Sequence, residues 1–338
     1  LGRIGGKTVA FYLFTCVCAV CIGIGVFYVV HPGAGVEAMP LSDASSIGTM
    51  EEVSVLSIIV NIVPDNMVNA VLNADMLQII FIAVLCGVAV GAIGERGKVL
   101  KDIFDACNEL FLRITRMIIS LVPLATFCAI TSLVSTTGPQ MLTMLLGLIA
   151  TFVLGLVVLL VLYGLLILVL ARENPLHFYR KFSPCMLLGF TLSSSNAVMP
   201  TTMHYAETKL GVPPKVASFS IPLGATINMD GSCVYLATSA LFLATVYGVD
   251  ISGGMLVTLG ISVMMLAIGA PGITGAAFIC LSTLVVQLGI PVEAVTILMG
   301  IDQLMSMLRT AANTTGDAVG SIVVAKSEKL LDTEMYRS

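Results

Sequence analysis

The sequence has 338 residues, of which 57% are hydrophobic and only 11% are charged. Soluble domains average about 25% charged residues, so this composition, with a mean hydropathy of +1.03, excludes an ordinary soluble domain and indicates an integral membrane protein. The net charge of −4 and the lack of a basic tract give no indication of a nucleic-acid partner.

Long apolar runs predict an all-α polytopic fold. The run MLLGLIATFVLGLVVLLVLYGLLILVLA exceeds the roughly 20 residues that cross a bilayer as a helix. Lysine and arginine mark cytoplasmic loops, and here they gather in five stretches: 3–7, 96–116, 172–181, 209–215 and 326–337. Four other connections contain neither residue: 31–54, 135–141, 247–255 and 289–294.

With the basic loops placed inside the cell, the first crossings follow in chain order. Residues 8–30 cross outward, 55–94 return in broken pieces, 117–134 cross outward and 142–171 cross inward. Segment 182–208 then begins and ends at basic loops, so it enters and leaves from the cytoplasmic side.

The remaining crossings complete the topology. Segment 216–247 crosses outward, and segment 255–290 enters and leaves from outside because neither of its flanking loops contains lysine or arginine. Segment 294–325 crosses inward, so both termini of this chain are predicted to be cytoplasmic.

The two returning segments each have a break at the centre, SSSNAVMP in the first and GAPGITG in the second. Polar residues interrupt the crossing helix after each of them, NMDG at 228–231 and RTAANTTGD at 309–317. This order predicts an inverted repeat with two opposed re-entrant helical hairpins and two interrupted transmembrane helices. Such matching breaks are typical of a midplane binding site in a secondary transporter. The alternative is that glycine and proline merely kink ordinary helices.

Charged side chains inside the membrane need partners, because each costs roughly 2.5–3.5 kcal/mol at the centre of a membrane helix. Arg309 and Asp302 lie seven residues apart on one helical face, so they are able to form a structural pair. We favour the alternative that Arg309 binds a substrate carboxylate, since its fork of donors matches that group.

Asp230 and Asp317 have no cationic partner in the sequence. Carboxylates, the nearby amides of Asn228 and Asn313, and backbone carbonyls freed at a helix break are oxygen ligands that small hard cations prefer. We therefore favour bound cations at these positions over a proton relay.

Four ordered motifs resemble one known family. They are TLSSSNAVMP, PLGATINMDGS, GAPGITGAAF and DQLMSMLRTAANTTGDAVGSIVVAK. They resemble the dicarboxylate/amino acid:cation symporters, which include the glutamate transporters and the bacterial C4-dicarboxylate carriers. Weaker matches reach back to GRIGGKTVAFYLFTC, which resembles the approach to the third transmembrane helix of that family. The first two helices of the family are therefore expected to be missing from this chain.

The resemblance implies a multi-pass symporter of the cell membrane, surrounded by lipid and assembled as a homotrimer. It implies no enzyme activity and no prosthetic group, with sodium as the transported coupling ion. Residues 1–30 would form a third-helix-like segment that contributes to a cation site, and 31–171 an extracellular loop and scaffold helices. Residues 172–338 would form the transport core, which comprises hairpin 182–208, broken helix 216–247, hairpin 255–290, broken helix 294–325 and a cytoplasmic tail.

The resemblance also implies a substrate site. Its residues would be Ser193, Ser194, Ser195, Ser232, Ile273, Ala277, Ser306, Arg309, Thr310 and Asn313. Arg309 would hold one carboxylate, and Asn313, Thr310 and the serine-rich hairpin tip the other. The backbone at Ile273 and Ala277 would close a lid over the substrate.

Three sodium sites are implied in the same way. The first would use Gly224, Asn228, Asn313 and Asp317; the second Thr226 with Ala267, Ile268 and Ala270; the third Asp230, Asn228, Thr15 and the Tyr12 carbonyl. At the third site Cys16 replaces a hydroxyl that the family often has, and a soft thiol is a poor sodium ligand.

The substrate class depends on the position three residues before Arg309. Amino-acid-transporting members of the family usually have an acidic residue there for the substrate ammonium, whereas this chain has Ser306. Thr310 and Asp317, in contrast, resemble the amino-acid branch. We favour a C4-dicarboxylate such as succinate, fumarate or malate, with glutamate or aspartate, coupled to sodium or protons, as the alternative.

Two other classes of function fit less well. An intramembrane serine protease would pair a serine of the first hairpin with His204, but it would leave the buried charges without a role. An ion channel would show flux that does not saturate and does not need both solutes together.

Overall fold

The computed structural model describes residues 2–32, 63–72, 76–119, 140–270 and 275–338. It also describes five single positions between these ranges, Leu124, Phe127, Cys128, Thr131 and Ser135. The described residues form helices and their connections, without a strand, as the apolar runs predict. The chain divides into two compact units, Leu1–Met50 with Pro139–Ser338, and Glu51–Gly138.

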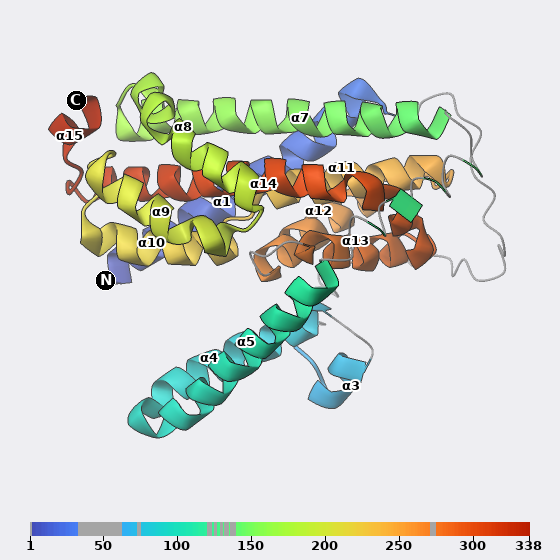
Figure 1. Cartoon of the computed structure of the whole chain (residues 1–338), viewed down its shortest axis with the longest axis horizontal. Helices are drawn as coiled ribbons and strands as arrows, with labels where there is room; N and C mark the ends of the chain where they lie inside the picture. The colour runs from blue at the N-terminus through green and yellow to red at the C-terminus, as the bar shows by residue number, and fades with distance from the viewer. Residues whose placement is uncertain are drawn as a thin grey trace. The chain divides into compact units, whose positions relative to one another are not determined.

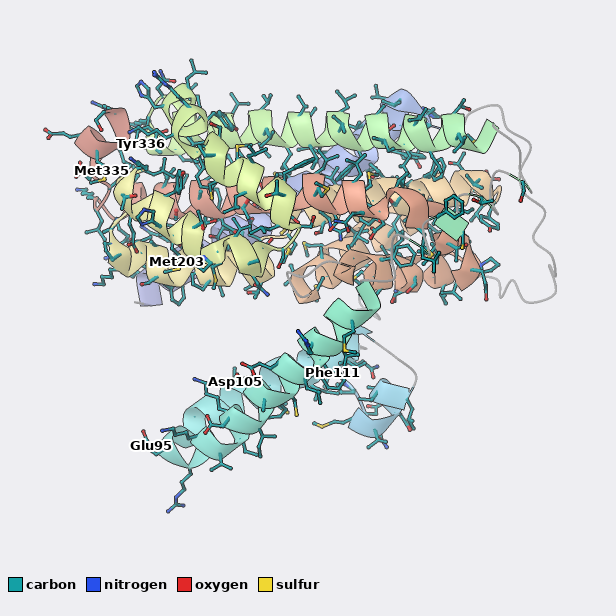
Figure 2. All side chains as sticks on the ribbon, viewed as in Figure 1. Glu95, Asp105, Phe111, Met203, Met335 and Tyr336 are labelled. Carbon is teal, nitrogen blue, oxygen red and sulfur yellow. The ribbon has the colours of Figure 1, made fainter. Side chains whose placement is uncertain are left out.

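The smaller unit is a helical hairpin with a short helix before it. Helix α3 (Met67–Leu72) precedes α4 (Met76–Ile93), a 3₁₀ turn η2 (Gly94–Gly97) and α5 (Lys98–Ile119). Gly94 has a φ of +66°, which a residue with a side chain rarely adopts, so it suits the turn between α4 and α5. Figure 2 shows Glu95 at this turn and Asp105 and Phe111 along α5.

Helix α5 corrects one sequence-based expectation. Residues 96–116 were expected to be a basic cytoplasmic loop, whereas 98–119 form one amphipathic helix. Basic residues report the side of the membrane, but they do not prevent a helix when apolar residues recur between them at helical spacing. The crossing expected at 117–134 lies mostly outside the described residues and stays a prediction, as does the start of the segment expected at 55–94.

Among the described residues of the larger unit, three stretches are long and apolar enough to cross a membrane: Arg3–Val30, Leu142–Ala171 and Pro214–Val246. They correspond to α1 (Gly2–Val30), α7 (Gln140–Leu166) with its π-helical end η3 (Ile167–Ala171), and the pair α10 (Pro214–Ile227) and α11 (Asp230–Val246). Every residue of α11 except Thr245 is buried, so α11 is the centre of this unit. Helices α1, α7 and α14 (Met299–Ser327) pack around it (Figure 1).

Two further helix pairs flank this centre. Helix α8 (Pro175–Leu192) is followed by α9 (Ser195–Thr208), and α12 (Gly253–Gly269) by α13 (Ala276–Gln287). Ser193 ends α8 with a left-handed φ of 51°, and the hydroxyl of Ser194 caps α9 by accepting from Ala197 N. The break therefore lies in the serine-rich stretch that the sequence indicated. The loop 271–274, within GAPGITG, lies outside the described residues.

Helix α14 corrects a second expectation. RTAANTTGD at 309–317 was expected to interrupt a membrane helix, but α14 continues through it, after a 3₁₀ segment η4 (Val292–Leu298). The threonine hydroxyls bond within the helix: Thr310 donates to Ser306 O at 2.8 Å, and Thr314 to Thr310 O at 3.0 Å. Polar side chains satisfied in this way do not break a helix, even where it is buried. The break at Asn228 and Met229, between α10 and α11, occurs as expected.

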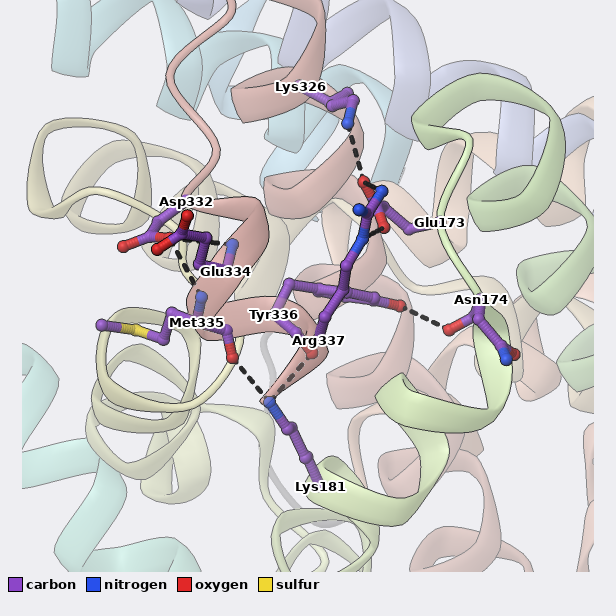
Figure 3. A network of polar contacts seen from close by, with 9 residues as sticks. All are labelled: Glu173, Asn174, Lys181, Lys326, Asp332, Glu334, Met335, Tyr336 and Arg337. Atoms are coloured by element: carbon purple, nitrogen blue, oxygen red, sulfur yellow. Dashed lines mark hydrogen bonds and ion pairs between the residues drawn. The ribbon is translucent and has the colours of Figure 1, made fainter.

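A polar cluster ties together the end of the unit where α14 stops (Figure 3). The buried Glu173 carboxylate accepts from Lys326 Nζ and Arg337 Nε, each at 2.8 Å. Helix α15 (Thr333–Arg337) also places Tyr336, whose hydroxyl donates to Asn174 O at 3.0 Å. Lys181 of α8 donates to the Tyr336 carbonyl at 2.9 Å. The C-terminal segment thus joins α14 to the start of α8.

Candidate functional site

The break between α10 and α11 faces the polar stretch of α14. At Gly231 a Cβ atom would lie 2.6 Å from the Arg309 carbonyl oxygen, so α11 begins directly against the α14 backbone. Gly231 N, one of the N–H groups that a helix start leaves without an intrahelical partner, donates to Asn313 Oδ1 at 2.8 Å. A glycine at the helix start therefore brings polar side chains from both helices together.

Arg309 is 4% exposed and is only partly paired. Its Nη2 donates to the Ser306 hydroxyl at 3.2 Å, and its Nη1 lies 3.5 Å from Asp302 Oδ1. The guanidinium carbon lies 4.9 Å from the centre of the Tyr235 ring, and the Tyr235 hydroxyl donates to Asp302 Oδ1 at 3.0 Å. Within the described residues Nη1 has no hydrogen-bond partner. One arm of the arginine fork thus remains available to an anion.

The structural pair considered from the sequence is therefore present in a weak form. A separation of 3.5 Å without a hydrogen bond is longer than the 2.7–2.9 Å of a charge-assisted contact. Asp302 offsets part of the charge of Arg309, but it does not saturate the guanidinium.

Asn313 lies between the arginine and the helix break. Its Nδ2 donates to the Ser232 hydroxyl at 3.4 Å and contacts Met229 Sδ at 3.2 Å. Helix α8 and the turn after it contact the same helix, since Gln303 Nε2 donates to the Ser193 hydroxyl at 3.3 Å and a Cβ at Gly189 would lie 2.9 Å from Thr314 Oγ1. Helix α8, at Gly189, and the start of α11 therefore both contact α14 near Asn313, whereas Ser193 contacts α14 nearer its start.

Asp317 is buried against the end of α10. Its Oδ1 accepts from Asn228 Nδ2 at 3.0 Å, and Asn228 Oδ1 accepts from the Thr15 hydroxyl at 3.2 Å. The Thr15 hydroxyl is also within 3.1 Å of the Tyr12 carbonyl. A Cβ at Gly224 would collide with the Asp317 carboxylate. Oxygen atoms from α1, from Asn228 at the end of α10 and from Asp317 of α14 thus lie close together.

Asp230, the first residue of α11, is fully buried. Its Oδ2 accepts from the Tyr163 hydroxyl of α7 at 2.6 Å, whereas its Oδ1 has no hydrogen-bond partner in the part of the chain that the structure describes. The ion pairs found among these residues include neither Asp230 nor Asp317. The dipole of α11 favours a negative charge at its start, but a buried carboxylate still needs a positive partner.

The remaining predicted residues are less closely joined. The Thr226 side chain is exposed and donates to Leu223 O at 2.8 Å, and the hydrogen bonds found in the described ranges do not connect it to Ala267, Ile268 or Ala270. Ala277 is buried on α13, and Ile273 lies outside the described residues. The second cation site and the lid therefore stay predictions, and so do the roles of the other residues.

Sequence reasoning did not select Tyr163 and Tyr235. Each tyrosine bonds a carboxylate that is distant along the chain, so no local motif connects them. One signal was present for Tyr163, because it is the sole side chain with a hydrogen-bonding group between Phe152 and Ala171. A buried tyrosine hydroxyl in an apolar helix requires a partner.

Comparison with known proteins agrees with this arrangement of motifs. The sequence model that describes the sodium:dicarboxylate symporter family matches residues 1–327 of this chain. The chain belongs to this family. Its relatives include the proton/sodium-glutamate symport protein of Bacillus caldotenax, 33% identical over 97% of this chain and 79% of the relative. They also include the C4-dicarboxylate transport proteins of Xanthomonas campestris (32% identical) and Rhodospirillum rubrum (35% identical), each covering 99% of this chain and 76% of the relative.

The sodium:dicarboxylate symporter family consists of transporters rather than enzymes, as the resemblance implied. Its name and those of these relatives give the general class of cargo, which is a dicarboxylate or glutamate moved together with a cation. Apolar helices long enough to span a bilayer fit a membrane location for this chain.

Proposed function

We propose that this chain is a sodium-coupled secondary active symporter that imports a small dicarboxylate, with a C4-dicarboxylate favoured over an acidic amino acid. One observation carries the proposal. Buried Arg309, whose Nη1 makes no hydrogen bond within the described residues, lies on the same helix as Asp317, a buried carboxylate that is in none of the ion pairs found there, and Asn313 lies between them. A substrate carboxylate would pair with the arginine, and a bound cation would pair with the buried carboxylate.

The donor set favours a hard cation. Asn228, Thr15, Asp317 and the Tyr12 carbonyl offer oxygen atoms, and no cluster of three or more His, Cys, Asp or Glu side chains occurs in the described part of the chain. Transition metals prefer nitrogen and sulfur ligands, whereas oxygen ligands suit hard ions such as sodium. Asp230 Oδ1 is buried without a hydrogen-bond partner in the described part of the chain, so a cation bound there would complete the carboxylate.

The surroundings of Arg309 favour a substrate without an ammonium group. Ser306 is 1% exposed and already accepts a hydrogen bond from Arg309, and its neutral hydroxyl offers an ammonium group no negative charge to pair with. Asp302 is engaged by Arg309 and by the Tyr235 hydroxyl. The acidic amino acid remains the alternative because Thr310 and Asp317 resemble that branch of the family.

Transport requires a favourable balance of charge. A dicarboxylate carries two negative charges, so more than two sodium ions must accompany it for net positive charge to move inward. Each net charge then gains about 2.3 kcal/mol per 100 mV of membrane potential. The number of functional cation sites, including the one at Asp230, therefore determines how far the substrate is concentrated.

The architecture belongs to the proposal as well. The pairs α8–α9 and α12–α13 would be two re-entrant hairpins that enter from opposite faces as an inverted repeat. Residues 31–171 would supply scaffold within a homotrimer, and 172–338 the moving core. Lys7 of α1 bonds Glu328 at the end of α14, which supports placing the two ends of the chain on the same side of the membrane, and we assign that side to the cytoplasm from the positions of the basic residues.

Competition in proteoliposomes tests the substrate class. Unlabelled succinate should displace labelled succinate at lower concentration than aspartate does, and uptake should require an inward sodium gradient. Ser306→Asp should shift this preference toward aspartate by about tenfold, since it adds a charge-assisted partner for the ammonium. An unchanged preference in this variant would contradict the role assigned to Ser306.

Asp317→Asn tests the sodium assignment. The substitution removes a buried negative charge while keeping nearly the same shape, so the sodium concentration for half-maximal uptake should rise by about tenfold or more. Glu334→Gln, which removes an exposed carboxylate, is the matched control. An unaltered sodium response of Asp317→Asn would count against this site.

The other classes of function make different predictions. Ser195 and His204 are on one helix, nine residues and about 13 Å apart along its axis, so they cannot form a catalytic dyad there. Uptake that saturates and needs substrate and sodium together would separate a symporter from an ion channel.

A further inference from the structure

Tyr163 reaches the Asp230 carboxylate from a helix that the motifs do not include. It is fully buried on α7, and its hydroxyl donates to Asp230 Oδ2 at 2.6 Å. A hydroxyl that donates to an ionised carboxylate makes a charge-assisted hydrogen bond, which is stronger than a neutral one. This contact fixes one oxygen of the carboxylate to α7.

Gly316 of α14 makes room for this contact. A Cβ at this position would collide with the Tyr163 hydroxyl and with Asn228 Nδ2. No left-handed backbone angle requires glycine here, so the requirement is steric. The glycine in the TTGD sequence thus lets the α7 hydroxyl and the Asn228 amide approach α14 at the same point.

The two oxygens of Asp230 are therefore unlike each other. Oδ2 is occupied by Tyr163, and Oδ1 is buried without a hydrogen-bond partner among the described residues. Helix α1 supplies the fully buried Cys16, whose thiol lies 3.6 Å from the Ile227 carbonyl and adds no oxygen ligand. Because Cys16 supplies a thiol where a hydroxyl oxygen could bind the ion, the site depends more on the placement of Asp230 Oδ1.

We propose that Tyr163 is a positioning residue of the cation site at Asp230, because its hydroxyl holds the carboxylate with Oδ1 directed to the bound sodium ion. This inference rests on the proposed function, since it assumes that sodium binds at Asp230. Without the hydroxyl, the carboxylate loses the bond that restrains rotation about its Cβ–Cγ bond. The sodium ion must then order the carboxylate as it binds, which lowers the affinity for sodium. Partners that orient a metal ligand typically change ion affinity by 10–100-fold.

The test uses the purified full chain without substrate. Thermal unfolding is measured across a series of NaCl concentrations, and again with LiCl, with choline chloride keeping the ionic strength constant. Because binding to the folded state raises Tm, the midpoint of the Tm increase reports ion affinity independently of transport. Each variant is compared with its own Tm without sodium, so a loss of intrinsic stability does not obscure the result.

Tyr163→Phe should raise the sodium midpoint by about tenfold and change the ratio of the lithium and sodium midpoints. Tyr336→Phe is the matched control, because it also removes one buried tyrosine hydroxyl bond, to Asn174 O, at the C-terminal cluster. Its sodium midpoint should stay unchanged. In an Asp230→Asn background, Tyr163→Phe should add less than a twofold further shift.

The outcomes separate the two proposals. If the unaltered chain gains no stability from sodium, sodium coupling itself fails. If the unaltered chain responds and Tyr163→Phe has the same midpoint and selectivity, the positioning role fails while sodium coupling stands. An equal shift by Tyr163→Phe with and without Asp230 would also overturn the positioning role, since the effect would then not act through that carboxylate.

Discussion

At the scale of single residues, the site depends on charged groups that the protein leaves incomplete. Arg309 contacts Ser306, Asp302 and the Tyr235 ring, yet Nη1 makes no hydrogen bond among the described residues. An incomplete buried guanidinium reduces stability unless a ligand completes it. Its retention is best explained by an anion that binds and leaves, which is what a transport cycle requires.

Arg309→Ala should therefore abolish dicarboxylate uptake and weaken substrate binding at least about 30-fold, because truncating one partner of a buried charge pair costs 2–5 kcal/mol. Substrate affinity is measured from the substrate-dependent increase in Tm. Arg180→Ala, on the exposed face of α8, is the matched control and should retain uptake. Undiminished uptake by Arg309→Ala would remove this residue from the substrate site.

The sequence indicated most of these residues but not how they are joined. The polar motifs identified Asp230, Asp317 and Arg309, because a charge in an apolar segment is conspicuous without a structure. The roles of Tyr163 and Tyr235 come from contacts between helices distant in sequence, and a lone tyrosine in an apolar run does not name its partner.

At the scale of elements, breaks were predictable where backbone chemistry causes them. The serine-rich turn after α8 and the stretch between α10 and α11 both end helices as expected. The uninterrupted course of α14 was not predictable from composition, because the hydroxyls of Thr310 and Thr314 bond back to their own helix. Polarity alone does not distinguish a helix break from a helix that presents polar side chains to its neighbours.

The close approach of α11 to α14 at Gly231 is the contact that forms the site. Gly231→Ala places a Cβ 2.6 Å from the Arg309 carbonyl, so the two helices must separate. We expect the free energy of unfolding to fall by about 1–3 kcal/mol. The affinity for succinate should fall by a larger fraction than the free energy of unfolding does. Both are measured as Tm values with and without succinate.

Gly25→Ala is the matched control for this prediction. Gly25 lies within α1, and a Cβ there meets no atom within 4 Å, so its Tm and its succinate response should be unchanged. Normal succinate binding by Gly231→Ala would mean that the helix contact does not set the site geometry.

At the scale of the larger unit, the C-terminal cluster joins elements that are distant in sequence. Glu173 follows the π-helical end of α7, Lys326 lies in the last turn of α14, and Arg337 ends α15. Burial alone would raise the pKa of Glu173, but the hydrogen bonds from Arg337 and Lys326 outweigh burial and lower the pKa below its ordinary value. The carboxylate is therefore charged at neutral pH, and this cluster contributes to the stability of the folded unit.

The lowered pKa fixes the direction of the pH dependence. A carboxylate with a lower pKa in the folded state stabilises the fold fully at pH values above its unfolded pKa, about 4.3, and this stabilisation is lost as the pH falls through the folded pKa. Glu173→Gln should lower stability by about 1.5 kcal/mol at pH 7, the lower end for hydrogen bonds to charged groups, because Arg337 is largely exposed. Tm is measured from pH 7 to pH 3, and the difference from the unaltered chain should shrink once the pH falls below the unfolded pKa, about 4.3. Glu334→Gln removes an exposed carboxylate of α15 and should show no such difference. A Tm deficit in Glu173→Gln that stays constant with pH would indicate lost packing rather than a lost charge.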